Sequence, residues 1–133
     1  MRELILLRHA HAVPAGAGQA DLDRPLSPEG LAEAEAAGRW LEENGLVPDC
    51  VLCSPARRTR ETLEAVLGVI GYIDQRLEPS IYDATAGALV ALLHSGQSGD
   101  YRGMPPGGIA VLSMPAGVAI EPGIGTLAAF WWP

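Results

Sequence analysis

The stretch that most constrains this chain is the run Leu4-Ile5-Leu6-Leu7, followed at once by Arg8 and His9. Four consecutive apolar residues predict a buried β-strand. The strand presents an arginine and a histidine at its carboxyl end, which is where open α/β sheets bind their ligands. An arginine fork suits phosphate oxygens, and an imidazole is a nucleophile and a base near neutral pH. This pairing indicates phosphoryl chemistry.

A second cluster of arginines follows another short apolar run. Residues 50–53 predict a buried strand, and Ser54 to Thr62 then opens a predicted helix that continues to Gly68. A single Arg-His pair is explained at least as well by a polar strand end. Two such clusters at equivalent strand ends in one small domain instead indicate a pocket for an anion.

The segment between these two strands predicts a helix. Ser27 is suited to cap it, with Pro28 as its first residue, and apolar residues then recur at spacings of three and four up to Leu41. Asn44 and Gly45 predict its end. The order strand, helix, strand predicts a βαβ crossover.

Further elements are predicted after the second helix. Gly71 and Tyr72 break that helix, and a short third strand is expected over residues 77–82. Two apolar runs, 109–113 and 127–132, are separated by proline and glycine turns and predict a hairpin of edge strands. Trp131 and Trp132 alternate faces, so one is expected to pack on the core and the other to stay partly exposed.

Composition limits the classes of function. A length of 133 residues with 48% hydrophobic content fits one domain over residues 1–133 with a real core. A net charge of -7 argues against a general nucleic-acid or acidic-membrane surface, so the arginine clusters must attract an anion locally. No apolar run approaches the ~18 residues of a membrane span, and no signal peptide is evident. A soluble, cytoplasmic protein is expected.

Two sequence pairs suggest metal or redox chemistry. Cys50 and Cys53 have a C-x-x-C spacing, but residues three apart in a strand point to opposite faces, so both are expected to be small core residues. His9 and His11 could share one face of a strand, and a metal pair there is a minor alternative. No metal or other cofactor is expected.

Three motifs, in this order, resemble the histidine phosphatase superfamily, and most closely its bacterial phosphohistidine phosphatase branch. Leu7 to Ala10 resembles the Arg-His signature, residues 23–30 are similar to an Arg-Pro-Leu segment, and Ser54 to Thr62 resembles a Ser-Pro-x-x-Arg element. The resemblance implies a phosphoglycerate mutase-like, three-layer α/β/α fold. We expect a mostly parallel sheet, helices on both faces and an antiparallel C-terminal edge hairpin.

The resemblance also implies site residues and a mechanism. His9 would attack phosphorus and form a phosphohistidine intermediate that water cleaves. Arg8 and Arg58 would bind the phosphate and neutralise its charge without a metal, whereas Arg57 and Arg60 are expected to face solvent or pair with acids. Asp83 would be the general acid, although a helix-capping or loop role explains it equally well.

The sequence departs from the family at one point. Members carry a buried strand ending in Gly-His, whose histidine completes the pocket, and this chain has no Gly-His. A segment is therefore expected to be missing between about residues 82 and 90, which would leave a gap in the sheet. His94 is the one histidine besides His9 and His11, and its place after an apolar helical run is typical of an exposed helix end.

Three classes of function follow. The first is a phosphatase of phosphohistidine proteins, such as histidine-containing phosphotransfer domains, with small phosphate esters as alternative substrates. The second is a non-catalytic phosphate-binding or interaction module, because the second histidine is missing. The third is a metal-dependent hydrolase that uses His9 and His11. A monomer or dimer is expected, without a nucleic-acid or membrane partner.

Overall fold

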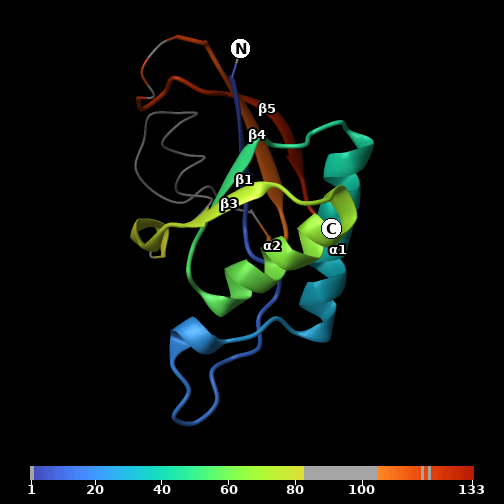
Figure 1. Ribbon diagram of the computed structural model, residues 1–133, viewed down its shortest axis with the longest axis vertical. Coiled ribbons are helices and arrows are strands. Elements are labelled where there is room, and N and C mark those ends of the chain that lie inside the picture. The colour runs from blue at the N-terminus through green and yellow to red at the C-terminus, as the bar shows by residue number, and fades with distance from the viewer. Residues whose placement is uncertain (1, 83–104, 118, 120) are drawn as a thin grey trace.

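The computed structural model describes residues 2–82, 105–117, 119 and 121–133 (Figure 1). In chain order its elements are β1 (Arg2–Leu7), η1 (Asp21–Asp23), α1 (Pro28–Glu43), β2 (Cys50–Cys53), α2 (Arg57–Ile70), β3 (Asp74–Leu77), η2 (Pro79–Ile81), β4 (Ile109–Met114) and β5 (Thr126–Trp131). Among these residues, no helix is long and apolar enough to cross a lipid bilayer. Asp83, His94 and the segment expected to be interrupted between about 82 and 90 lie outside the described residues, apart from Tyr82.

The described strands form two sheets of different polarity. In the first, β1 and β5 both pair with β4, and both pairs are antiparallel. In the second, β2 and β3 pair in parallel, as expected for strands joined by a helix. The α/β class is confirmed, but the expectation of a mostly parallel sheet is wrong for the described strands. The reason is that β4 lies next to β1 and runs opposite to it.

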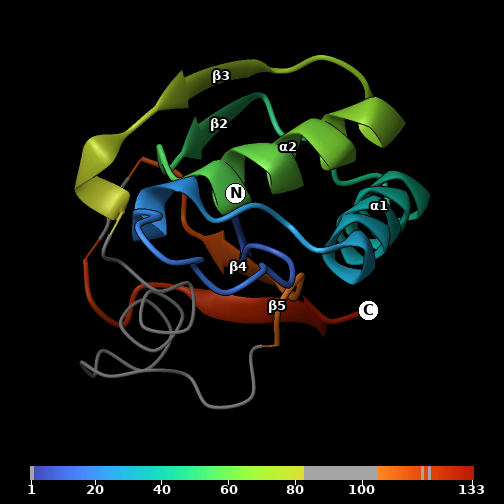
Figure 2. The ribbon, with the colours of Figure 1, turned by 90° about the horizontal axis from the view of Figure 1, so that it is seen from below.

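Both helices pack against one face of the three-stranded sheet. The core joins Ala37 and Leu41 of α1 and Val66 of α2 to Ile109 and Val111 of β4. Figure 2 shows the two helices side by side. The opposite face of β4 carries Ala110 against Leu6, Leu127 and Phe130, with no helix of the described residues on it. Helices on both faces are therefore not seen within the described part of the chain.

The predicted caps of α1 are confirmed. Ser27 accepts a hydrogen bond through Oγ from the Gly30 N–H at 2.9 Å, and Asn44 is the C-cap, followed by Gly45 at a φ of 66°. Gly30 also brings the helix onto the backbone of His11, because a Cβ at Gly30 would lie 2.0 Å from the His11 carbonyl oxygen. The start of α1 is thus fixed against the residues that follow β1.

Two strands and the cysteine pair differ from the sequence-based expectation. The third strand is β3, earlier and more polar than residues 77–82, because Pro79 lacks an N–H and begins a short 3₁₀ helix instead. The strand β4 is central and buried rather than an edge strand, since it pairs on both sides. Cys50 is exposed and Cys53 is buried, so only the second is a core residue, and both are free.

The two C-terminal tryptophans behave as expected. Trp131 stacks on Trp40 of α1 with ring centroids 5.6 Å apart. Trp132 stays exposed and meets Phe130 edge to face. The stacked pair ties the last strand to the first long helix.

Candidate active site

The end of β1 is held from two sides. The N–H of Arg8 donates to the Gly108 carbonyl at 3.1 Å, and the N–H of Gly107 donates to the His9 carbonyl at 3.1 Å. On the other side, the N–H of the fully buried Ala10 donates to Thr62 Oγ1 at 3.1 Å. The loop before β4 and the helix α2 therefore both position the Arg8-His9 pair.

The imidazole of His9 has a defined tautomer. Its Nδ1 lies 2.8 Å from the carbonyl oxygen of Ala10, and since a carbonyl only accepts, Nδ1 must carry the proton. Burial lowers the pKa of His9 below its ordinary 6.5, and the bond to Ala10 raises it less. The neutral ring then keeps a lone pair on Nε2. This is the form that a nucleophilic histidine requires.

Three arginines act electrostatically on this imidazole. The positive charges of Arg58, Arg8 and Arg24 each lower the pKa of His9 further, which requires all three to lie within electrostatic reach of the ring. The structure thus brings together the three predicted residues His9, Arg8 and Arg58. It adds Arg24, which belongs to the Arg-Pro-Leu segment but was not predicted as a site residue. An anion is the ligand that such a group of cations favours.

Arg58 is the least exposed of the three arginines that form ion pairs within the described residues. Its side chain is 12% exposed, and Nη1 donates to the backbone oxygen of Asp21 at 3.0 Å and to its Oδ2 at 3.2 Å. The Tyr82 ring lies 5.6 Å from its guanidinium carbon. The buried Nε of Arg58 has no hydrogen-bond partner among the described residues. This arginine keeps an unused donor.

Asp21 is a residue that the sequence interpretation missed. Its carboxylate accepts from Tyr82 Oη, from Arg24 Nη1 at 3.1 Å and from Arg58. The hydrogen bond from Tyr82 and those from the arginines lower the pKa of Asp21 from 3.8 to about 2. Only the spacing of three residues between Asp21 and Arg24 was visible in the sequence. The contacts with Arg58 and Tyr82 span 37 and 61 residues, so no local pattern could predict them.

Comparison with known proteins identifies the family. The sequence model of the histidine phosphatase superfamily (branch 1) matches residues 4–102. This chain belongs to the histidine phosphatase superfamily. The match includes Arg8, His9 and Arg58, the residues on which the resemblance was based.

The chain is also similar to two uncharacterized proteins over part of its length. An uncharacterized chloroplastic protein of Arabidopsis thaliana is 40% identical over 64% of this chain and 40% of its own length. An uncharacterized protein of Mycobacterium tuberculosis is 53% identical over 43% of this chain and 35% of its own. The chain therefore spans well under half the length of these two relatives.

A solved structure matches over almost the whole chain. It is a protein of Agrobacterium tumefaciens assigned as the phosphohistidine phosphatase SixA. The identity is 26%, the TM-score is 0.80, and the match covers 98% of this chain and 97% of that one. The histidine phosphatase fold is thereby confirmed.

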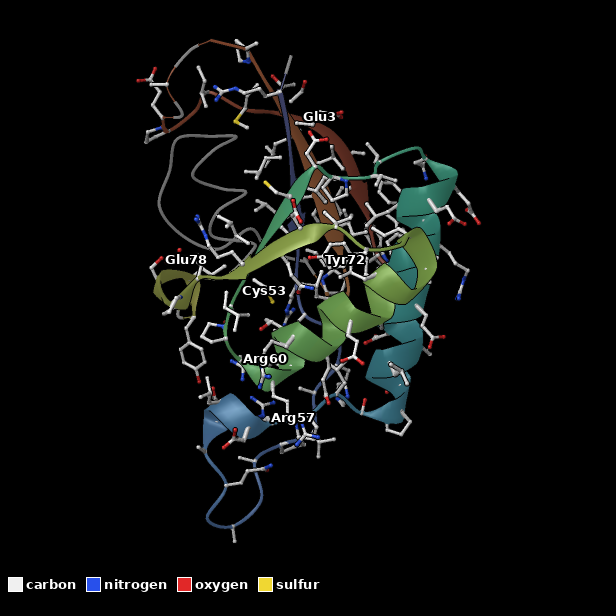
Figure 3. All side chains as sticks on the ribbon, viewed as in Figure 1. Glu3, Cys53, Arg57, Arg60, Tyr72 and Glu78 are labelled. Atoms are coloured by element: carbon white, nitrogen blue, oxygen red, sulfur yellow. The ribbon has the colours of Figure 1, made fainter. Side chains whose placement is uncertain are left out.

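The other two arginines at the start of α2 lie as expected, because they face solvent or pair with an acid. Arg57 is about half exposed and pairs with Glu61 at 3.2 Å, and the exposed Arg60 donates to the Pro55 carbonyl. Figure 3 shows both side chains at the start of α2, toward the side that carries η1. Of the three arginines at the start of α2, Arg58 is the one whose charge lowers the pKa of His9. Arg58 is thus separated from its two neighbours by geometry.

The imidazole of His11 has a hydrogen-bond partner, and this contact competes with binding of a metal ion at the same nitrogen. Its Nδ1 lies 2.7 Å from Ser27 Oγ, while the Nδ1 of His9 is engaged by Ala10. Within residues 2–82, 105–117, 119 and 121–133, no group of three or more His, Cys, Asp or Glu side chains could hold a metal ion. The Nδ1 atoms of the two imidazoles therefore bond to different residues, Ser27 for His11 and Ala10 for His9.

Proposed function

We propose that this chain is a phosphatase of protein phosphohistidine that acts through a covalent intermediate on His9. The observation that carries the proposal is the His9 imidazole, whose Nδ1 donates to the Ala10 carbonyl and whose pKa is lowered by burial and by the charges of Arg58, Arg8 and Arg24. The similarity to the Agrobacterium tumefaciens protein, assigned as a phosphohistidine phosphatase, supports the choice of substrate. Small phosphate esters are the alternative substrates.

The proposed reaction has two displacements at phosphorus. In the first, the Nε2 lone pair of His9 forms a bond to phosphorus while the substrate P–N bond breaks, and the released imidazole nitrogen takes up a proton from solvent water. In the second, water attacks the phosphoryl group on Nε2. The P–N bond to His9 breaks, and phosphate leaves with the elements of water.

The arginines supply the electrostatic part of this mechanism. Negative charge on the equatorial phosphoryl oxygens is stabilised by guanidinium donors that are already in place. Arg8 and Arg58 have this role in the proposal. Asp83 remains the proposed acid for an alcohol leaving group. An imidazole leaving group needs less acid assistance, which suits the phosphohistidine substrate.

The test compares two histidine substitutions in the presence of a chelator. We expect His9→Ala to abolish hydrolysis of phosphohistidine, because it removes the nucleophile, and His11→Ala to keep most of it. Activity of the unmodified chain is expected to persist in EDTA. Loss of activity in both variants, or on chelation with recovery on adding zinc, would instead favour the metal-dependent alternative with His9 and His11.

A non-catalytic phosphate-binding module is the second candidate. The observation in its favour is that the sequence contains no Gly-His, the family element that contributes a second histidine to the pocket. Trapping the phosphorylated enzyme by acid-free denaturing electrophoresis separates the two functions. A labelled chain that loses the label in His9→Ala supports the enzyme, and binding of phosphate without labelling supports the module.

A further inference from the structure

A groove between the two long helices is not used by the proposed chemistry. It encloses about 650 Å³ and is lined by Leu26, Ser27, Pro28, Leu31, Glu35, Glu61, Glu64, Ala65, Gly68 and Val69. This volume is in the range of ligand-binding clefts in proteins. Leu31 of the lining is 47% exposed. A large aliphatic side chain is thus left for a partner to cover.

The lining of the groove is negatively charged. It contains three glutamates and no arginine, and the chain has no lysine. Glu61 is already engaged, because it accepts from the Leu26 N–H at 2.8 Å and from Arg57 at 3.2 Å. The carboxylates of Glu35 and Glu64 have no ion pair or hydrogen bond with any described residue. They are available to a cationic partner.

Several residues of the groove lining are close in sequence to residues of the candidate active site. Ser27, in its lining, bonds to His11, two residues after His9, and Leu26 lies two residues after Arg24. On α2, Glu61 follows Arg58 by three residues, which is one helical turn. Residues of the acidic, partly apolar groove therefore lie within three positions of Arg24 and Arg58.

We propose that this groove docks the phosphorylated partner protein through a segment that bears arginine or lysine beside one large apolar residue. The phosphoryl group would enter the arginine pocket while the cationic flank pairs with Glu35 and Glu64, and the apolar residue covers Leu31. The charge pattern of the surface is complementary to that partner and repels a segment with acidic flanks. The inference rests on the proposed function, of which it specifies the substrate class.

The experiment uses two short synthetic phosphohistidine peptides, one with arginines and a leucine next to the phosphohistidine and one with glutamates there. The unmodified chain should hydrolyse the basic peptide with the higher kcat/KM. The double variant Glu35→Gln/Glu64→Gln should lower kcat/KM for the basic peptide by roughly 3- to 25-fold, the size expected from two exposed ion pairs. Hydrolysis of phosphoramidate, which cannot reach the groove, should not change.

The matched control removes the same charge elsewhere. Glu42→Gln/Glu43→Gln lies at the opposite end of α1, outside the groove lining, and should leave the preference between the peptides intact. The preference should also shrink as salt is raised to about 0.5 M, because exposed ion pairs are screened. Equal kcat/KM for the two peptides, or an equal loss in both double variants, would overturn the proposal.

A binding measurement separates this inference from the proposed function. Titration calorimetry with stable phosphonate analogues of the two peptides needs no turnover. Tighter binding of the basic analogue, lost in Glu35→Gln/Glu64→Gln, would support the docking groove even if no hydrolysis occurred. If the groove substitutions instead change the mass of the protein in sedimentation and leave peptide binding equal, the occupant is a second copy of the chain and the proposal is wrong.

Discussion

At the residue scale, the proton on Nδ1 of His9 determines which ring nitrogen can act as the nucleophile. Because the Ala10 carbonyl accepts from Nδ1, the reactive lone pair of His9 is confined to Nε2. Burial and the nearby arginines hold the pKa of this ring below 6.5, so it stays neutral at physiological pH. Protonation would remove the nucleophile, and the arginine charges oppose it. The same guanidinium groups would therefore bind phosphate and keep the histidine reactive.

The acid limb of the pH profile tests this arrangement. We expect kcat/KM to decline with falling pH through a pKa below 6.5, since the neutral ring is the active form. Arg58→Ala should raise the His9 pKa, because removing a nearby cation stabilises the imidazolium. NMR titration of the ring measures this without relying on activity. Arg57→Ala is the control and should leave the value unchanged, and a downward shift in Arg58→Ala would contradict the assignment.

The two neighbouring arginines should differ in phosphate affinity. Charge-assisted hydrogen bonds to a buried anion contribute roughly 1.5–3 kcal/mol, whereas exposed charges contribute about 0–1 kcal/mol. With side-chain exposures of 12% and 47%, Arg58 and Arg57 belong to these two classes. We therefore expect Arg58→Ala to weaken vanadate binding by roughly 10- to 150-fold and Arg57→Ala by less than about fivefold. Calorimetric titration with vanadate measures both, and equal losses would show that the wrong arginine was chosen.

At the scale of elements, the contact between α1 and the segment after β1 positions the site. The carbonyl of His11 accepts from the Ser27 N–H at 3.0 Å, and Gly30 packs against the same backbone. The second helix approaches from the other side, since Thr62 accepts from Ala10 and donates to the Arg58 carbonyl at 2.7 Å. The two residues that follow the proposed catalytic histidine, Ala10 and His11, are thus held by α2 and by the start of α1.

Substitution of two helical glycines tests these contacts. Gly30→Ala should reduce the free energy of unfolding by at least about 1–3 kcal/mol, because its Cβ would overlap the His11 carbonyl and push α1 away. Gly68→Ala is the matched control, since a Cβ there meets no atom within 4 Å, and it should stabilise α2 by about 0.5–1 kcal/mol. Urea unfolding measures both changes. A neutral Gly30→Ala would mean that α1 is not seated on this backbone.

The whole molecule is divided into two sheets within its described part. There, β1 pairs with β4 alone and β2 with β3 alone, so each has one edge without a ladder to another described strand. Leu4 to Leu7 of β1 are partly rather than fully buried, and Leu52 of β2 is 54% exposed. We propose that the element ending in Gly-His in the family belongs between these edges. Its absence from the sequence would cost both burial and a catalytic donor.

Turnover of the 133-residue chain tests this proposal at the level of the whole molecule. Removing one preorganised donor typically costs ~10²–10³ in rate. We expect the chain to bind vanadate through Arg8 and Arg58 but to hydrolyse phosphohistidine slower by that factor than relatives with the Gly-His element. Measurements are to be made on protein whose intact mass is 13.9 kDa. A comparable rate would make the second histidine dispensable, and His94→Ala would then show whether His94 replaces it.

The features that the sequence alone determined are local ones. The apolar run before Arg8, the Ser27 cap and the glycine after α1 act within a few residues, so their patterns predict structure directly. The contrast between Arg58 and Arg57 came from the motif resemblance, and geometry now explains it. The family assignment followed from motifs in order, because a catalytic strand end needs its residue types in fixed succession.

Only the tertiary structure decided the features that depend on distant residues. The central position of β4 rests on pairing with β1 across more than a hundred residues, and an apolar run does not specify its neighbours. Asp21 reaches Arg58 and Tyr82 only because η1, α2 and the end of η2 meet in space. The acidic groove likewise exists only where α1 lies against α2. Long-range packing sets all three, since side-chain contacts between remote segments leave no period in the sequence.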